Sequence, residues 1–331
     1  MAQITDSEIR NQLLDRQKAV AIEIDRVGHT AELDRLLAEV NAALIRVDDG
    51  TFGLCEVCLE PIEHDRLAAD PLVRVCLDHL TTVEQRALER DLELAAKIQR
   101  GLLPAPYARV SGWEINYHYH PASIVSGDYC DYFATHGGDL YFMIGDVSGK
   151  GVAASMLMSH LHATFRTLIL MNLPLDQLVT QASRLFSESA LPAQYATLVC
   201  GKSSRTGHVE IANAGHPAPL VVREGRVDRI DATGLPMGMF RNQQFEIHRL
   251  AMRPGEMFVL YTDGLVEAED EVGTEYGIER LSHLVARSAA LELPSVVQAC
   301  VKDLESFKSG TGSTDDVTIM TLRRTAFEFE A

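Results

Sequence analysis

Apolar side chains recur every three or four residues through the first third of the chain, as they do along one face of an amphipathic helix. The pattern predicts helix over residues 3–47, with a bend at His29-Thr30, and a second helical stretch over residues 81–103. Pro104 follows this stretch and ends it, because proline does not continue a helix. The first third of the chain is therefore predicted to be largely helical.

Beyond Pro106 the pattern changes to short segments in which apolar and polar residues alternate, as is typical of strands with one buried face. Longer segments with helical spacing lie between them. Many strands with a few grouped helices indicate an α+β domain rather than a repeating βαβ one. The predicted strands are residues 113–119, 140–145, 195–201, 208–213, 218–222, 245–250, 256–262 and 316–322, and the predicted helices are residues 152–171, 175–189, 276–290 and 294–308.

The composition is that of a globular protein with a strongly acidic surface. The chain has 331 residues, of which 46% are hydrophobic, and its formal net charge is −17 at pH 7. Because the excess of acids is spread along the chain, we expect its surface to repel nucleic acids and anionic membranes. No apolar run is long enough to span a membrane and no secretory signal is recognised, so we expect a soluble, cytoplasmic protein. Six unevenly spaced cysteines do not indicate a disulfide framework.

Two pairs of metal-ligand residues lie close together in the sequence. Cys55 and Cys58 are separated by two residues, as are Cys76 and His79, and 17 residues lie between the pairs. Thiolates and an imidazole at this spacing can close a tetrahedral Zn²⁺ site with no open position, which predicts a structural zinc ion. An isolated redox Cys-x-x-Cys is the alternative, but it leaves the second pair unexplained.

The cysteine module resembles the DksA/TraR zinc-finger family over about residues 35–80. The resemblance rests on the preceding helix, the stretch GTFG-L-C, the segment from Ile62 to Leu67, and Pro71. The chain departs from that family at His79, where the family usually has a cysteine. Because members of the family bind RNA polymerase through an acidic coiled-coil tip, the resemblance makes RNA polymerase a candidate partner, although no such tip is evident here.

Acidic residues stand beside several predicted strands of the second half of the chain. They are Asp128, Asp146, Asp263 and the pair Asp315-Asp316. Singly, Gly-Asp and Asp-Gly are common turn dipeptides. Together, carboxylates at the ends of several strands of one domain can meet at one point, where divalent cations would have to separate them. Oxygen ligands without His or Cys favour Mg²⁺ or Mn²⁺, and two such ions can activate a shared water for in-line phosphoryl displacement.

A glycine-rich loop follows Asp146. Its glycines at 145, 149 and 151 fit neither a Walker loop nor a dinucleotide-binding fingerprint, because the spacing and the following element are wrong for both. Small residues would instead let the backbone turn sharply after the acid, so that a carbonyl such as that of Val147 reaches a metal. The loop is therefore predicted to serve the carboxylate rather than to bind a nucleotide.

Seven sequence blocks then reveal a resemblance that covers residues 93–322. In order, they are ELAAKIQRGLLP, SGDYCDYF, IGDVSGKGVAASMLM, NAGHPAPL, GLPMGMF, YTDGLVEA and DDVTI. They resemble the SpoIIE/RsbU-type branch of the metal-dependent protein phosphatases, which have the protein phosphatase 2C fold. The resemblance implies two antiparallel sheets packed face to face and flanked by helices. It also implies a centre of two Mn²⁺ or Mg²⁺ ions that removes phosphate from serine or threonine of a protein.

The same resemblance assigns roles to the acids. Asp146 and Asp263 are the expected catalytic residues, with Asp146 bridging both metals and the Val147 carbonyl on one of them. Asp128 is expected to serve the second metal, largely through water, and Asp263 the first.

One ligand position is left open by the sequence. Asp315 is favoured as a further ligand of the first metal, with Asp316 as the alternative. Lys150 lies where relatives often have His, a departure that should not disturb the metals.

The chain is thus expected to contain four segments. These are N-terminal helices (1–50), a zinc finger (51–80), a linker helix (81–106) and a phosphatase domain (107–326).

The resemblance implies that the substrate is a phosphorylated anti-sigma-factor antagonist of the STAS type. The apolar stripe of the linker helix suits a helix pair and predicts a homodimer, and we expect the zinc module to adjust activity through this helix. The alternative is an interaction protein that docks its finger on RNA polymerase and uses the second domain as a scaffold.

Overall fold

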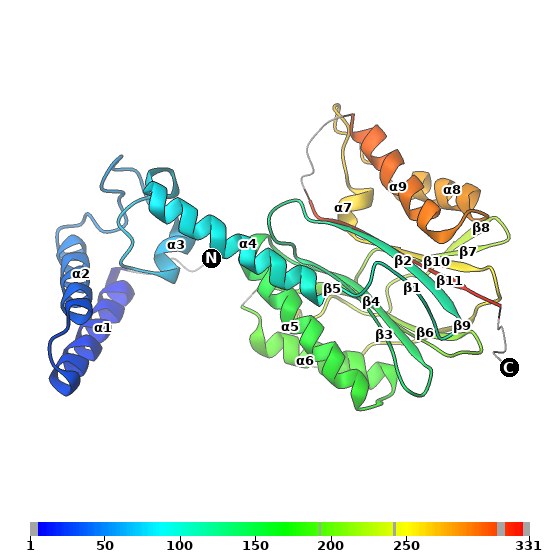
Figure 1. The fold of residues 1–331 in the computed structure, drawn as a ribbon, viewed down its shortest axis with the longest axis horizontal. Coiled ribbons are helices and arrows are strands. Elements are labelled where there is room, and N and C mark those ends of the chain that lie inside the picture. Colours follow the sequence, from blue (N-terminus) through cyan, green and yellow to red (C-terminus); the bar gives the residue numbers. More distant parts are fainter. Residues whose placement is uncertain (1–5, 192, 241–242, 310–314, 327–331) are drawn as a thin grey trace. The chain divides into compact units, whose positions relative to one another are not determined.

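The structure is a computed structural model, which describes residues 6–191, 193–240, 243–309 and 315–326 (Figure 1). It contains two compact units, Met1–Asp91 and Leu92–Ala331, which we describe separately. No helix in the described part of the chain is long and apolar enough to cross a membrane.

The first unit begins with a pair of helices, α1 (Asp6–Val27) and α2 (Ala31–Asp48). The predicted bend lies between them, and Thr30 caps α2 because its side-chain oxygen accepts a hydrogen bond from the amide of Leu33. Apolar residues that recur at helical spacing are buried between the two helices, among them Leu13 and Val40, both fully buried. The helix pair is held by the same stripes that predicted it.

The cysteine module follows, with a short helix α3 (His64–Ala69) and a single 3-10 turn, η1 (Leu77–His79). Its small core contains Cys55, Ile62 and Cys76. So small a core is seldom stable without a staple such as a metal ion.

Helix α4 (Thr82–Leu102) is the predicted linker helix. Its start is fixed by a capping box, because Thr81 and Glu84 exchange hydrogen bonds between side chain and backbone. Residues 82–91 of α4 belong to the first unit and residues 92–102 to the second.

The second unit contains two antiparallel sheets. The six-stranded sheet has the order β1 (Tyr107–Val110), β2 (Trp113–His120), β11 (Val317–Arg324), β10 (Met257–Tyr261), β7 (Leu220–Arg223), β8 (Arg226–Arg229). The five-stranded sheet has the order β3 (Asp128–Ala134), β4 (Leu140–Val147), β5 (Ala196–Ser203), β6 (His208–Ala214), β9 (His248–Ala251). Large apolar side chains of both sheets meet between them, for example Phe142 against Phe258 with ring centroids 5.9 Å apart. The two sheets therefore form a sandwich with a shared core.

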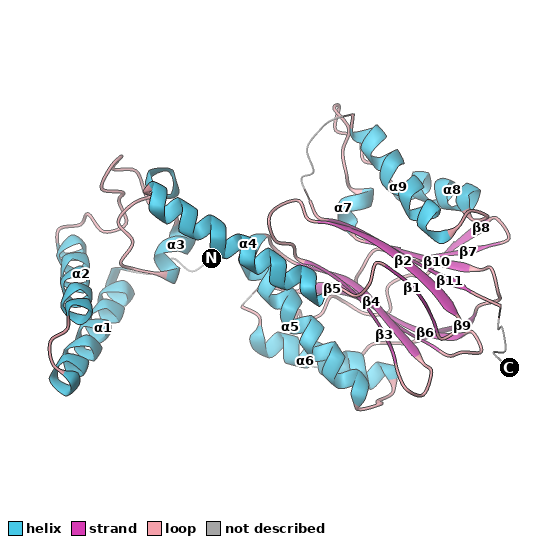
Figure 2. Ribbon diagram, viewed as in Figure 1, coloured by secondary structure: helices cyan, strands magenta, loops and turns pink. Residues whose placement is uncertain are grey.

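Two pairs of helices cover the outer faces of the sandwich (Figure 2). Helices α5 (Gly151–Leu170) and α6 (Leu175–Ser189) pack on the five-stranded sheet, with Phe165 stacked on Tyr129 of β3. Helices α8 (Ile278–Ser288) and α9 (Leu293–Lys308) cover the six-stranded sheet. The predicted α+β architecture, two antiparallel sheets flanked by helices, is confirmed.

The pattern did not indicate strands β1, β3 and β8 or the short helix α7 (Asp263–Val266). In β3 the reason is Asp131, a fully buried carboxylate that interrupts the apolar pattern. Arg166 of α5 satisfies this carboxylate with two hydrogen bonds of 2.6 and 2.7 Å. The predicted strand at 245–250 begins only at His248.

Candidate metal centre

The acids predicted as metal ligands lie at the ends of strands of both sheets. Asp128 begins β3 and Asp146 lies near the end of β4, and the two residues are direct cross-strand partners. In the other sheet, Asp263 follows β10 at the first position of α7, and Asp315-Asp316 directly precede β11. Because β10 and β11 are antiparallel neighbours, the end of β10 and the start of β11 lie side by side. We call the part of the domain where these strand ends and the acids lie the edge.

Two glycines allow the backbones at this edge to approach closely. A Cβ on Gly264 would lie 2.0 Å from the carbonyl oxygen of Asp316, so no side chain fits there. A Cβ on Gly127 would lie 2.9 Å from the carbonyl oxygen of Val147 and 3.3 Å from Oδ1 of Asp146. Both positions are therefore restricted to glycine by space rather than by a left-handed φ.

Asp128 connects the two sheets. Its carboxylate is 1% exposed, and Oδ2 accepts hydrogen bonds from the hydroxyls of Thr262, at 3.0 Å, and of Thr318. Burial raises the pKa of Asp128 well above its usual range, and the negative charge of Asp146 adds to the effect. Since one oxygen is engaged by the two threonines, a water-mediated contact to a metal would have to use the other.

The remaining acids concentrate negative charge at this edge. Burial, with the nearby carboxylates of Asp263, Asp315 and Asp316, raises the pKa of Asp146 to about 8. Burial and the charge of Asp315 likewise raise the pKa of Asp263. Such a cluster is unfavourable when ionised unless cations lie among the carboxylates.

Lys150 lies next to this cluster and offsets part of its charge. Its Nζ is 3.4 Å from Oδ2 of Asp315, and it opposes the rise in the pKa of both Asp146 and Asp263. The lysine side chain is 66% exposed, so it is screened by solvent and accessible to a ligand.

Asp315 and Asp316 have different surroundings. Both carboxylate oxygens of Asp316 accept hydrogen bonds from the loop that precedes β3: Oδ1 from the amide of Ala122, and Oδ2 from the Ser126 hydroxyl and the Gly127 amide. By contrast, the Asp315 carboxylate accepts a hydrogen bond from the amide of Asp316 at 2.9 Å and lies 3.4 Å from Nζ of Lys150. The difference is an effect of tertiary structure, because the two residues are adjacent and identical in sequence.

The donors at this edge are carboxylate and carbonyl oxygens, the set that Mg²⁺ and Mn²⁺ take. In the described part of the chain, only the cysteine group has three or more ligand atoms within 4.8 Å of one another. The carboxylate oxygens of the acids are therefore more widely spaced than the ligands of a single compact site. The donor chemistry and the excess of negative charge fit hard divalent cations.

The cysteine group forms a second candidate metal site. The ligand atoms of Cys55, Cys58, Cys76 and His79 all lie within 4.8 Å of one another. The sulfurs of Cys58 and Cys76 are 3.8 Å apart, which matches the edge of about 3.8 Å expected for a tetrahedron with Zn–S distances of about 2.3 Å. Although burial opposes it, backbone amides of Cys58, Cys76 and Val57 lower the pKa of the Cys55 thiol to about 6. All four predicted ligands are thus together, and the set fits Zn²⁺.

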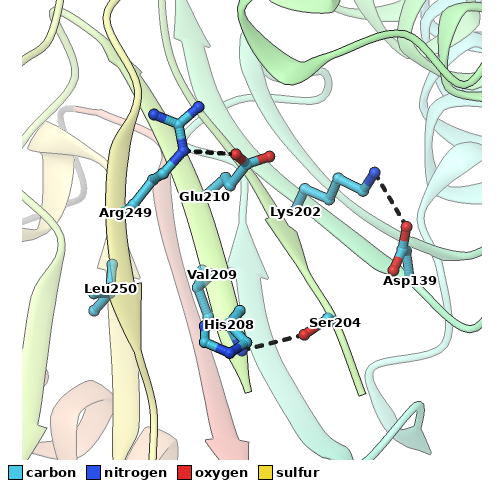
Figure 3. A pocket seen from close by; sticks show the side chains of 8 residues that line it. All are labelled: Asp139, Lys202, Ser204, His208, Val209, Glu210, Arg249 and Leu250. Atoms are coloured by element: carbon cyan, nitrogen blue, oxygen red, sulfur yellow. Dashed lines mark hydrogen bonds and ion pairs between the residues drawn. The ribbon is translucent and has the colours of Figure 1, made fainter. Parts of the chain in front are cut away.

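A pocket of about 440 Å³ lies elsewhere in the second unit, at strands β5, β6 and β9 (Figure 3). Its charged side chains are paired with each other, Lys202 with Asp139 at 3.1 Å and Arg249 with Glu210 at 2.9 Å. None of the predicted site residues lines it. The candidate centre is therefore the edge with the carboxylates and not this pocket.

The sequence pattern missed several residues that hold the site together. Thr262, Thr318 and Ser126 hydrogen-bond to the acids, and Gln99 of α4 holds Ser126. The only local signal for the threonines is their position next to the acids, in YTDG and DDVT.

Comparisons with known proteins place this domain in a family. Residues 136–325 match the Stage II sporulation protein E (SpoIIE) family, a range that includes Asp146, Asp263 and Asp315. The chain is 28% identical to Protein IcfG of Synechocystis over 265 residues, which are 71% of this chain and 41% of the relative. It is also 28% identical to the phosphoserine phosphatase RsbP of Bacillus subtilis over 185 residues, 54% of this chain and 46% of the relative. The chain thus spans less than half the length of either relative.

A solved structure has the same fold. The SiaA-PP2C domain of Pseudomonas aeruginosa superimposes with a TM-score of 0.64 at 21% identity, over 75% of this chain and 100% of that one. Since the family match spans more than half of the residues, the chain belongs to the SpoIIE family.

Proposed function

We propose that this protein is a metal-dependent protein serine/threonine phosphatase. The observation that carries the proposal is the convergence of Asp146, Asp263 and Asp315 from both sheets on one edge, where burial and mutual repulsion raise the pKa values of Asp146 and Asp263. The name of the relative RsbP as a phosphoserine phosphatase supports the same chemistry.

Two Mn²⁺ or Mg²⁺ ions would be held by the carboxylates of Asp146, Asp263 and Asp315 and by the carbonyl of Val147, with Asp128 behind the second ion. When bound, such a pair activates water and stabilises charge on a phosphoryl group. Asp315 rather than Asp316 is the proposed ligand, because the oxygens of Asp316 already accept three hydrogen bonds from the loop before β3.

The residues of the chain itself would orient the substrate. Lys150 is exposed beside Asp315 and can donate a hydrogen bond to a phosphate oxygen. Gly149 and Gly151 have φ of +98° and +75°, a conformation that favours glycine, so the turn that follows Asp146 depends on these two residues.

The finer parts of the proposal concern substrate and control. The substrate would be a phosphorylated STAS-type anti-sigma-factor antagonist. One Zn²⁺ would be held by Cys55, Cys58, Cys76 and His79 in a DksA/TraR-type finger. A homodimer would form through α4, on which Val83 and Ile98 are 74% and 60% exposed. The zinc module would adjust activity through this helix.

The test is Mn²⁺-dependent dephosphorylation of phosphorylated candidate antagonists. Asp146→Asn and Asp263→Asn should each lower kcat by at least about 10³-fold, because each removes a charge that the cations need. Asp228→Asn, the same change at an exposed position on β8, is the matched control and should leave activity unchanged. Full activity of the first two variants, or activity that persists in chelator, would contradict the proposal.

A further inference from the structure

A buried amide connects helix α4 to residues 122–127, the loop before β3. Gln99 is 4% exposed, although glutamine side chains are mostly found at protein surfaces. Its Nε2 donates to the carbonyl oxygen of Ser126 at 2.7 Å, and its Oε1 accepts from the amide of the same residue at 3.0 Å. One side chain thus satisfies both backbone groups of one residue, which fixes the position and the orientation of that peptide.

The residue that Gln99 holds belongs to the network around the acids. The Ser126 hydroxyl donates to Oδ2 of Asp316 at 2.7 Å and accepts from the amide of Asp128 at 3.0 Å. The amide of Gly127 donates to the same Asp316 oxygen at 2.9 Å, and the amide of Ala122 donates to the other oxygen at 2.7 Å. The loop is therefore anchored to α4 through Gln99 and to the start of β11 through Asp316.

The same loop borders the other half of the candidate centre. The carbonyl of Gly127 accepts from the amide of Val147 at 3.3 Å. The space at Gly127 is so limited that an added Cβ would lie within 3.3 Å of both the Val147 carbonyl and Oδ1 of Asp146. A displacement of the loop would therefore act on both edges of the carboxylate cluster at once.

We infer that Gln99 is a positioning residue, which holds the loop and through it the carboxylate of Asp316 and the backbone at Asp128, and so keeps the cluster of acids in the arrangement that binds divalent cations. The inference rests on the proposed function for the identity of the cations. Gln99 acts through Ser126 and Asp316 rather than by direct contact with substrate or metal.

Two variants of Gln99 distinguish the effect of its two hydrogen bonds to Ser126 from the effect of its packing. Gln99→Leu keeps the approximate volume and removes both hydrogen bonds. Gln99→Glu keeps the shape and the acceptor but replaces the donor amide by a carboxylate, whose negative charge faces the Ser126 carbonyl oxygen. Gln85→Leu is the matched control, because it makes the same substitution on the same helix at an exposed side chain.

Three measurements on the full chain apply to each variant. They are hydrogen–deuterium exchange of residues 122–128, Mn²⁺ affinity from the electron paramagnetic resonance signal of free Mn²⁺, and the Mn²⁺ concentration that half-saturates phosphatase activity. We expect Gln99→Leu to accelerate exchange and weaken Mn²⁺ binding by about tenfold, with kcat at saturating Mn²⁺ changed less than the half-saturating concentration. Gln99→Glu should have an effect in the same direction, because its charge repels the Ser126 carbonyl oxygen, and Gln85→Leu should have none.

The outcomes distinguish this inference from the proposed function. If the wild-type chain has no phosphatase activity, the proposed function is wrong. Hydrogen–deuterium exchange and Mn²⁺ affinity still test whether Gln99 positions the loop. If Gln99→Leu does not fold, Gln99→Glu decides. Wild-type exchange and wild-type Mn²⁺ affinity in the folded Gln99 variants would overturn the inference.

Discussion

Asp315 and Asp316 are adjacent carboxylates whose charges both raise the pKa of Asp146, but their hydrogen bonds differ. Asp315 adds to the repulsion that raises the pKa values of Asp146 and Asp263, so it destabilises the metal-free protein. Asp316 accepts three hydrogen bonds from the loop before β3 and ties that loop to β11, so it stabilises the fold. Asp316 is thus engaged by backbone and side-chain donors of the loop, whereas Asp315 is the proposed cation ligand.

Substitution by asparagine should therefore affect the two positions in opposite ways. Asp315→Asn should relieve repulsion and leave the metal-free protein as stable as wild type or more so, while it weakens Mn²⁺ binding by at least about tenfold. Asp316→Asn should lower the free energy of unfolding by about 1–3 kcal/mol, because an NH₂ group replaces one of two carboxylate oxygens that accept hydrogen bonds in a partly buried network. Urea denaturation in chelator measures the free energy of unfolding of each metal-free variant. An Mn²⁺ titration of activity measures how tightly each variant binds Mn²⁺. The reverse pattern would make Asp316 the ligand.

Among the elements, the cysteine module has a small core of three buried residues, Cys55, Ile62 and Cys76. Its two ligand pairs are shaped by tight turns, in which the amide of Leu59 donates to the Cys55 carbonyl at 2.9 Å and the amide of His79 to the Cys76 carbonyl at 3.0 Å. These turns bring the side chains together, but the buried apolar residues around them are few. The free energy that folds the module should come largely from its metal.

Removal of one ligand should thus unfold the module. Cys76→Ser should reduce zinc from one ion per chain to less than about a tenth, because a structural Zn²⁺ contributes about 10 kcal/mol in zinc-finger peptides. His79→Cys should retain zinc, since it restores a four-cysteine set. Elemental analysis and hydrogen exchange over residues 51–80 are the measurements, with Cys300→Ser, outside the cluster, as the control for zinc content. Freshly purified wild-type protein without zinc would contradict this assignment.

At the scale of the whole molecule, one continuous helix belongs to both compact units. Helix α4 carries residues 82–91 in the first unit and Gln99 in the second, where the amide holds the loop beside the acids. Apolar side chains such as Val83, Leu94 and Ile98 remain exposed on it. Exposed apolar side chains on one helix favour pairing with a second copy, and the proposed control of activity would act through this helix.

Activity and assembly should therefore depend more on the rotation of the residues that follow an insertion in α4 than on the length of the helix. Insertion of two residues after Glu89 rotates everything beyond it by about 200°, whereas insertion of seven residues restores the phase to within about 20°. The two-residue insertion should change the oligomeric state and the activity, and the seven-residue insertion should restore both. Light scattering and phosphatase assays measure these quantities. If neither insertion changes activity or assembly, control through α4 is wrong.

The sequence alone determined the elements whose signal is local. The periodicity of apolar residues predicted α4, α5, α6 and α9 to within a few residues, because burial of one face repeats every turn. The spacing of the cysteines likewise predicted four ligands that lie together. The acids could be named as candidates, since each stands beside an apolar strand or within a recognised block.

Only the tertiary structure decided how the candidate centre is built. Strand β3 is not evident locally because its buried Asp131 is balanced by an arginine on a distant helix. The carboxylate of Asp128 is held by a threonine 190 residues away, and Gln99 reaches a serine 27 residues along the chain. Asp316 differs from Asp315 because residues 122–127, a loop distant in sequence, place their donors against the Asp316 carboxylate. Contacts between distant residues leave no periodic trace in the sequence, whereas helices and strands do.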